Sequence, residues 1–287
     1  MTPAYDLAIG GLRLRVESER SLRIPDHLLP FVTGSRPLGG EPAADEVILV
    51  RFGQPDLRSM GASPVLPGVY RTDRETVRTY RWGEGAYAVR IEPDDAHLPL
   101  CLWVPEAHGE EFCSRGDLLP YLALDRLLLR HDRILLHAAG VLYEGRAILF
   151  SAPSGVGKST QAELWRQYAG AEPINGDKII LSAADGVCMA YGGPIAGSSR
   201  IYRSISAPVA AIVMITQGTR NTITTLSPRH RCLSLYREAV KSAWDEAFNR
   251  HLLTVAEHIS RITEVLSMAC LPDETAVRAL KQFMTER

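Results

Sequence analysis

The sequence has few of the features that mark specialised classes of protein. Its 5 cysteines include no Cys-x-x-Cys pair, so it predicts neither a zinc site nor a disulfide framework, and reduced thiols are expected. The longest purely apolar stretch, Val209 to Ile215, is far shorter than the about 20 residues that a membrane-spanning helix needs. The first residues alternate apolar and polar side chains, without the apolar centre of a signal peptide. We therefore expect a cytoplasmic protein with no membrane partner.

An excess of one charge is also lacking. Lys and Arg together number 32, and Asp and Glu 33, which gives a formal net charge of -1. Binding to nucleic acid requires a clear excess of basic residues, so we expect no nucleic-acid partner. The balanced net charge does not exclude a local basic pocket. With 46% hydrophobic and 23% charged residues, the composition is typical of globular proteins. The length of 287 residues fits two domains of about 100–200 residues each.

The residue pattern changes near residue 115. Before it, short alternating or apolar runs are separated by Gly, Pro and Asp turns, which is typical of strands. The strands expected there are 12–16, 47–50, 70–71, 77–80 and 87–91. Residues 34–45 are expected to be a loop. After the change, Asp117 is expected to cap a helix over the leucine-rich residues 118–129, which is apolar on most faces and therefore buried.

The rest of the chain alternates strands with helices to its end. The expected strands are 134–143, 147–151, 172–175, 178–182 and 209–215. The expected helices are 157–169, 229–242, 245–262 and 273–285. This pattern predicts a mixed α/β domain over residues 116–287, preceded by a β-rich domain over residues 1–115.

The clearest chemical signal is a glycine-rich stretch between an apolar strand and a helix. Residues 147–150 (AILF) run into SAPSGVGKST at 151–160, and a helical segment with Leu164 and Trp165 follows. A strand, a glycine-rich loop, Lys-Ser and a helix form the context of a phosphate-binding loop. The residues expected to bind the nucleotide are Ser154, Gly155, Val156, Gly157, Lys158, Ser159 and Thr160.

Each part of this loop has a physical role in nucleotide binding. The glycines let successive N–H groups point at the phosphates, and the start of the helix adds the positive end of its dipole. The Lys158 ammonium reaches the β- and γ-phosphates, and the Ser159 hydroxyl ligates Mg²⁺. The stretch departs from G-x-x-x-x-G-K-[ST] at Ala152, so an incidental glycine-rich turn is the alternative. The loop predicts ATP and Mg²⁺ as cofactors.

A tight turn precedes the loop strand. Residues 135–143 form an expected strand, and only Glu-Gly separates them from the next, so the two strands are expected to form an antiparallel hairpin. If Tyr143 pairs with Arg146, His137 lies opposite Ala152, at the edge of the phosphate site. A slip of one residue stays open, because Glu-Gly also suits a bulged turn. His137 is therefore a candidate catalytic residue, with an ordinary core histidine as the alternative.

A carboxylate and a cation complete the candidate site. Asp177 comes one helix and one short strand after Lys158, which would return it to the same edge of the sheet. It is the candidate catalytic base and a candidate Mg²⁺ ligand, with a plain turn between strands as the alternative. The small-residue loop 191–200 ends in Arg200, a candidate contact for a substrate or a phosphate.

These residues resemble the catalytic domain of the HPr serine kinase/phosphorylase family, whose fold is shared with phosphoenolpyruvate carboxykinase. The likeness lies in Leu136-His137, the hairpin, the loop strand and SGVGKST, and it covers roughly residues 130–285. It implies a mixed-sheet P-loop domain in which a His before the loop and an Asp after the loop helix form the site. His137 and Asp177 match those two positions, and the family's second aspartate is replaced here by Lys178.

The chain is also similar to a divergent subgroup of these proteins, some of them from peptide-modification or lasso-peptide gene clusters. The subgroup has a Gly-x-Pro-x-x-Gly-x-Ser loop, which residues 192–199 (GGPIAGSS) match, and the strand after it is similar to residues 207–213. HPr kinases have a signature loop that serves both the reaction with HPr and its reversal by phosphate. This sequence has no counterpart of that loop. The resemblance therefore implies a kinase without implying HPr as its acceptor.

Together, the residues and the resemblance predict an ATP- and Mg²⁺-dependent kinase that transfers the γ-phosphoryl group to a hydroxyl, a Ser of a peptide or small protein. In this reaction Lys158 holds the phosphates, Asp177 takes the hydroxyl proton, and His137 supports Asp177 or the γ-phosphate. Two alternatives stay open: a small-molecule hydroxyl kinase of a biosynthetic pathway, and a nucleotide-binding regulatory module without chemistry. The expected partners are a nucleotide and the acceptor. Whether the chain forms a homo-oligomer is left undecided by the sequence.

Overall fold

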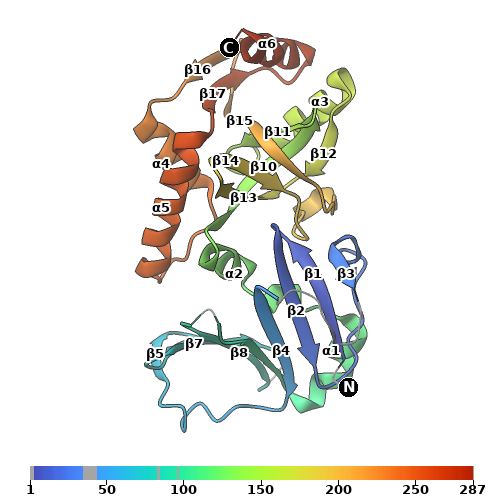
Figure 1. Cartoon of the computed structure of the whole chain (residues 1–287), viewed down its shortest axis with the longest axis vertical. Helices are drawn as coiled ribbons and strands as arrows, with labels where there is room; N and C mark the ends of the chain where they lie inside the picture. The colour runs from blue at the N-terminus through green and yellow to red at the C-terminus, as the bar shows by residue number, and fades with distance from the viewer. Residues whose placement is uncertain (1–2, 35–43, 83–84, 96, 287) are drawn as a thin grey trace. The chain divides into compact units, whose positions relative to one another are not determined.

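The computed structural model describes residues 3–34, 44–82, 85–95 and 97–286 (Figure 1). It divides the chain into two compact units, Met1–Leu127 and Leu128–Arg287. Most of the loop expected at 34–45 lies outside the described residues. Each unit has a sheet of its own.

The division between the units falls inside α2 (Leu124–Arg130) rather than at residue 115. The reason is local packing. Tyr121 stacks on Trp82, with ring centroids 5.6 Å apart, and meets the Tyr80 ring edge-on at 5.3 Å. The segment just before α2 therefore belongs to the first unit.

The described part of the first unit forms a nine-stranded sheet in the order β3-β1-β2-β4-β9-β8-β7-β6-β5. Its strands are β1 (Ala4–Ile9), β2 (Leu12–Ser18), β3 (Val32–Gly34), β4 (Glu46–Phe52), β5 (Ser63–Leu66), β6 (Val69–Arg71), β7 (Glu75–Arg81), β8 (Tyr87–Pro93) and β9 (Leu100–Val104). The pairs β2–β4 and β4–β9 are parallel and the others antiparallel. In β2, Leu12, Leu14 and Val16 are buried between half-exposed residues. The strands expected from alternation are confirmed.

The leucine-rich stretch 118–129 is largely buried, as expected, but it is not one helix. A 3₁₀ turn, η3 (Leu119–Tyr121), is separated from α2 by Ala123, whose φ of 44° is left-handed. Asp117 does not cap a helix here: the residue that precedes η3 is Leu118, with no side-chain cap, and the Asp117 carboxylate accepts a hydrogen bond from Arg115 Nε at 2.9 Å. The apolar pattern predicts that this stretch is buried. It does not predict the break in the helix, because the left-handed residue at the break is an alanine, which does not favour that conformation.

The second unit is mixed α/β, with its strands in the order β11-β10-β13-β14-β15-β17-β16 and β12 beside β10. Its strands are β10 (Arg133–Tyr143), β11 (Arg146–Ser151), β12 (Glu172–Asn175), β13 (Lys178–Ala184), β14 (Val187–Tyr191), β15 (Ser206–Gln217), β16 (Thr222–Thr225) and β17 (Val265–Cys270). β11 also pairs in parallel with β15. The sequence predicts β10, β11, β12, β13 and β15, and it misses β14, β16 and β17.

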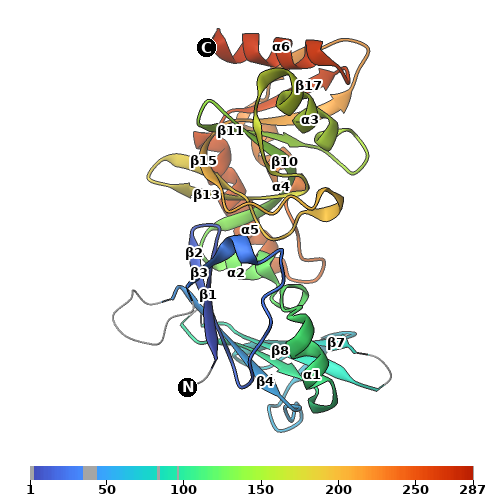
Figure 2. The same cartoon turned by 90° about the vertical axis from the view of Figure 1, so that its right-hand side faces the viewer.

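Helices cover both faces of this sheet. Successive side chains of a strand point to opposite faces. In β11, Leu149 packs in a core cluster with Leu235 of α4 (Pro228–Glu238) and Leu252 of α5 (Glu246–Ile262). Its neighbour Phe150 packs in another cluster, with Trp165 of α3 (Lys158–Ala169) and residues of α6 (Glu274–Thr285). α3 and α6 contact each other (Figure 2).

The helix expected over 229–242 ends at Glu238. Beyond it the chain is extended, with Ala239 in a bridge to β10. In the described part of the chain, no helix is both long and apolar enough to cross a bilayer.

Candidate functional site

The turn between β10 and β11 has the geometry that its two residues predict. Glu144 and Gly145 have φ of 49° and 75°, the left-handed values of a two-residue hairpin turn. Tyr143 pairs with Arg146 as expected, and the ladder ends one pair before His137. His137 is therefore the first β10 residue beyond the hairpin, beside the point where the chain leaves β11.

The loop between β11 and α3 leaves backbone N–H groups without side-chain caps. Gly155 and Gly157 have φ of 82° and 121°, a region that favours glycine. No side chain of the described residues caps α3 at Gly157. Ser154 and Gly155 are exposed, as are Ser159 and Thr160 in the first turn of α3. The first N–H groups of α3 are therefore available to an anion.

Lys158 is buried at the base of this loop. Its ammonium donates to the carbonyl oxygens of Ala152 at 2.9 Å and Pro153 at 3.2 Å, so it lies across the first residues of the loop. Burial lowers the pKa of Lys158, and the negative charges of Asp177 and Glu238 act in the opposite direction. Two carboxylates therefore stabilise the charged form of this lysine.

Asp177, directly before β13, lies against His137 in the middle of β10. In the register of β10 with β13, His137 faces Lys178, and the Ala138 N–H donates to the Asp177 carbonyl at 3.1 Å. His137 Nε2 is 3.2 Å from Asp177 Oδ1, and Lys178 Nζ is 3.3 Å from Oδ2. Burial lowers the pKa of His137, and Lys178 and Lys158 lower it further. Asp177 acts in the opposite direction, and the net lowering of the pKa favours the neutral form of the ring.

Asn175, the last residue of β12, holds this corner together, although it is not among the predicted site residues. Its Oδ1 accepts the N–H groups of Asp177 at 2.8 Å and Lys178 at 3.0 Å. Its Nδ2 donates to the carbonyl oxygens of Gly193 at 3.1 Å and Ile195 at 2.9 Å. The side chain is 1% exposed. An Asn side chain commonly accepts the backbone N–H two residues further along, as Asn175 does from Asp177, so the local part of its role could be predicted.

The glycine-rich loop after β14 packs directly against Asp177. It contains a 3₁₀ turn, η4 (Gly197–Ser199), in which Gly197 has a φ of 52°. A Cβ added to Gly197 would lie 3.0 Å from Asp177 Cγ, and one added to Gly176 would lie 2.5 Å from Ser199 Cβ. Glycine at both positions lets the two segments approach this closely.

Arg200 follows η4 directly and is exposed, with a φ of 51°. Among the described residues, no ion pair joins it to Asp177. The structure thus brings together the loop, His137 and Asp177, and places Arg200 next in the chain to the segment that covers Asp177.

The oxygen donors of the site fit Mg²⁺ bound together with phosphates. In the described residues, no group of three or more His, Cys, Asp and Glu side chains is arranged to hold a metal ion. Mg²⁺ commonly keeps several waters and takes only one or two protein groups in addition to phosphate oxygens. The exposed Ser159 hydroxyl and the Asp177 carboxylate are donors of that kind.

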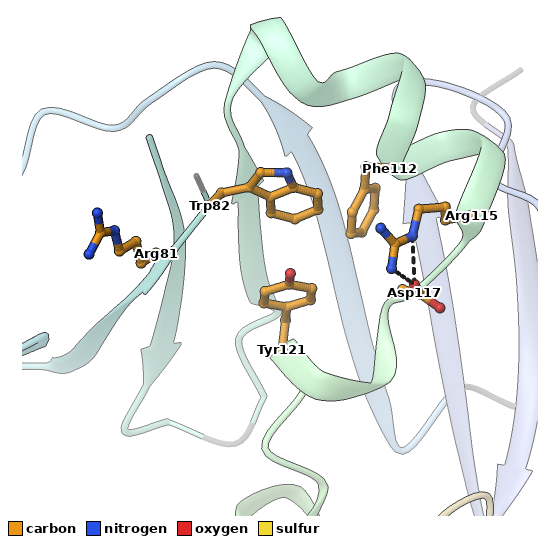
Figure 3. A pocket seen from close by; sticks show the side chains of 6 residues that line it. All are labelled: Arg81, Trp82, Phe112, Arg115, Asp117 and Tyr121. Carbon is orange, nitrogen blue, oxygen red and sulfur yellow. Dashed lines mark hydrogen bonds and ion pairs between the residues drawn. The ribbon is translucent and has the colours of Figure 1, made fainter. Parts of the chain in front are cut away.

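A hollow of about 240 Å³ lies in the first unit, away from these residues in the sequence (Figure 3). It is lined by Arg81, Trp82, Phe112, Arg115, Asp117 and Tyr121. The Trp82 and Tyr121 rings lie nearly parallel, and Phe112 of α1 (Gly109–Arg115) packs against both. Asp117, the acidic residue in this lining, is paired with Arg115 at 2.9 Å. The hollow therefore offers aromatic surface but no carboxylate free for catalysis.

No protein-family model matches the chain, and no curated protein matches it. Among solved structures, it is similar to the HPr(Ser) kinase/phosphatase from Coxiella burnetii, with 11% identity and a TM-score of 0.30. The match covers 53% of this chain and 93% of that chain. At this level of similarity, function has to be inferred from the arrangement of the residues themselves.

Proposed function

We propose that the second unit is the catalytic part of an ATP- and Mg²⁺-dependent kinase that transfers the γ-phosphoryl group to a hydroxyl, a serine of a peptide or small protein. The observation that carries this proposal is the 3.2 Å contact between His137 and Asp177, beside the loop that ends at Lys158. A phosphate-binding loop alone suits any nucleotide-binding protein. A carboxylate held next to that loop adds a group that can accept a hydroxyl proton.

The loop would bind the nucleotide mainly through its backbone. The N–H groups of Ser154 to Ser159 would surround the phosphates, and Lys158 would turn from the loop carbonyls toward the β- and γ-phosphates. Ser159 and Asp177 would hold Mg²⁺. The ion would neutralise phosphate charge when bound. Arg200 is the outer cation of this arrangement.

In the transfer step, the acceptor oxygen forms a bond to the γ-phosphorus while the bond from that phosphorus to the β–γ bridging oxygen breaks. The acceptor proton passes to Asp177, and the charge that develops on ADP is offset by Lys158. A neutral His137 can donate its Nε2–H to Asp177 and hold the carboxylate in place. Most of the rate would come from positioning and charge neutralisation.

A serine acceptor is supported by resemblance rather than by geometry. The loop, the hairpin and residues 192–199 resemble HPr serine kinases and their relatives from peptide-modification gene clusters. The lysine at position 178 departs from the family's aspartate pair and ion-pairs with Asp177. A site with this lysine fits phosphorylation in one direction better than reversal by phosphate.

The proposal is tested by incubating the full chain with Mg-ATP and serine-containing peptides, then measuring ADP and the mass of the peptides. Both products should form in equal amounts. ADP that forms only after small hydroxyl compounds are added would favour the small-molecule kinase. ATP binding without any ADP would favour the regulatory module.

A further inference from the structure

Two segments that are far apart in the sequence lie against each other next to Asp177. One is β12 with the turn after it, residues 172–177, and the other is the loop 192–203 after β14. The Arg203 guanidinium donates to a backbone carbonyl of β12 at 3.0 Å, which joins the start of the first segment to the end of the second. Asn175 joins the two segments closer to Asp177.

The Asn175 side chain uses its full hydrogen-bonding capacity for this link. An Asn amide has two acceptor positions on its oxygen and two N–H donors on its nitrogen. Both acceptor positions take backbone N–H groups of the turn, from Asp177 and Lys178. Both donors go to carbonyl oxygens of the loop, those of Gly193 and Ile195. Because all four positions are used and the residue is 1% exposed, Asn175 acts through its neighbours and not by contact with a ligand.

The two ends of this amide reach the Asp177 carboxylate by separate routes. Through its oxygen, Asn175 holds the backbone N–H of Asp177 at 2.8 Å. Through its nitrogen, it holds the Ile195 carbonyl at 2.9 Å. Two residues further along the loop, Gly197 approaches Asp177 so closely that an added Cβ would lie 3.0 Å from Cγ. The carboxylate that contacts His137 is therefore fixed at its backbone and covered at its side chain.

We propose that Asn175 is a positioning residue of the phosphoryl transfer, which fixes the Asp177 carboxylate by joining the turn before β13 to the loop after β14. This inference rests on the proposed function, in which Asp177 accepts the hydroxyl proton and binds Mg²⁺. Removing one side of a buried hydrogen-bond network leaves the partners on the other side unsatisfied, which is unfavourable. Aspartate has the acceptors without the donors and alanine has neither, so neither can join the two segments.

The test compares Asn175→Asp and Asn175→Ala with wild type in the full chain. The measured rate is ADP formation from saturating Mg-ATP in the presence of serine-containing peptides. Loss of an outer partner that orients a metal-ligating side chain typically costs about 10–100-fold. We expect a loss of that size in kcat for both variants, with the KM for ATP changed less than kcat, because the phosphate loop itself is untouched.

The matched control is Asn249→Asp. Asn249 of α5 also accepts a backbone N–H, at 3.2 Å, and donates to a backbone carbonyl, and both groups belong to Ser242. These bonds join α5 to the segment before it, so the control should lower the melting temperature and keep the wild-type kcat. Equal kcat in wild type and folded Asn175→Asp, or an equal loss in Asn249→Asp, would overturn the inference alone.

Hydrogen exchange in the wild-type chain tests the same contacts without a substitution. The amide hydrogens of Asp177 and Lys178 should exchange slowly, because their acceptor is a buried side chain. Exchange as fast as in an unstructured peptide would overturn the inference, and so would variants that both fail to fold, since Asn175 would then serve the fold. A wild-type chain that neither binds nor turns over Mg-ATP would overturn the proposed function and the inference with it.

Discussion

At the scale of single residues, Lys158 is the first test of the nucleotide site. Its ammonium is bonded to two loop carbonyls and would exchange them for the most highly charged phosphates. In Lys158→Ala, Mg-ATP should no longer raise the melting temperature, because a ligand stabilises the fold only through binding. The shift in melting temperature is the quantity to compare, and Lys281→Ala on α6 is the control. Equal shifts in wild type and Lys158→Ala would contradict the phosphate-loop assignment.

Asp177 is the second residue whose role can be isolated. Asparagine keeps the size and one acceptor oxygen of aspartate but removes the charge. A positioned general base contributes about 10²–10⁴-fold to a rate, so Asp177→Asn should lose transfer by a factor of that order. It should still fold and bind ATP.

The control for this variant is Asp185→Asn, at the other end of β13. Asp185 is exposed and has a φ of 52°, a conformation that asparagine accepts. It should keep full activity. A folded Asp177→Asn chain with near wild-type turnover would make Asp177 merely a turn residue and favour the regulatory module.

At the scale of the elements, two glycine variants distinguish the effect of the close packing of η4 on Asp177 from the effect of backbone strain. Gly197 and Gly186 have φ of 52° and 75°, and only at Gly197 would a Cβ meet another residue, Asp177 Cγ at 3.0 Å. An Ala in the left-handed region costs roughly 1 kcal/mol at either position. Gly197→Ala should in addition displace Asp177 and lower kcat about tenfold or more, whereas Gly186→Ala should lower only stability. Equal kcat values in the two variants would show that η4 does not position Asp177.

The sequence predicts a turn, helix or strand when neighbouring residues determine its conformation. The Glu-Gly turn predicts the hairpin with a slip of one residue left undecided, and the structure has the register in which Tyr143 pairs with Arg146, with left-handed φ values at both turn residues. The break in the helix at Ala123 is not predicted, because alanine does not favour the left-handed conformation that Ala123 adopts. The pairing of β10 with the segment after α4 is missed for another reason: Leu136 and Ala239, which form the bridge, are far apart in the chain, and periodicity does not reveal such a pairing.

At the scale of the whole molecule, every candidate site residue lies in the second unit, whereas the aromatic cluster around Trp82 lies in the first. Chains of two domains often unfold in more than one step. We expect two calorimetric transitions, of which Mg-ATP moves only one. At a ligand concentration 100 times Kd the gain is about 2.7 kcal/mol, and a domain of this size melts about 2–4 °C higher per kcal/mol. The expected rise is therefore about 5–10 °C.

A core variant identifies the other transition. Phe112 is 0% exposed and packs against Trp82 and Tyr121, and removing such a ring costs about 3–5 kcal/mol. Phe112→Ala should lower the melting temperature of the transition that Mg-ATP does not shift. The rise in melting temperature that Mg-ATP causes in the other transition should be the same as in wild type. If instead one transition responds to both the nucleotide and Phe112→Ala, the two units unfold together. Nucleotide binding in the second unit would then stabilise the first as well, because the two would share one unfolding equilibrium.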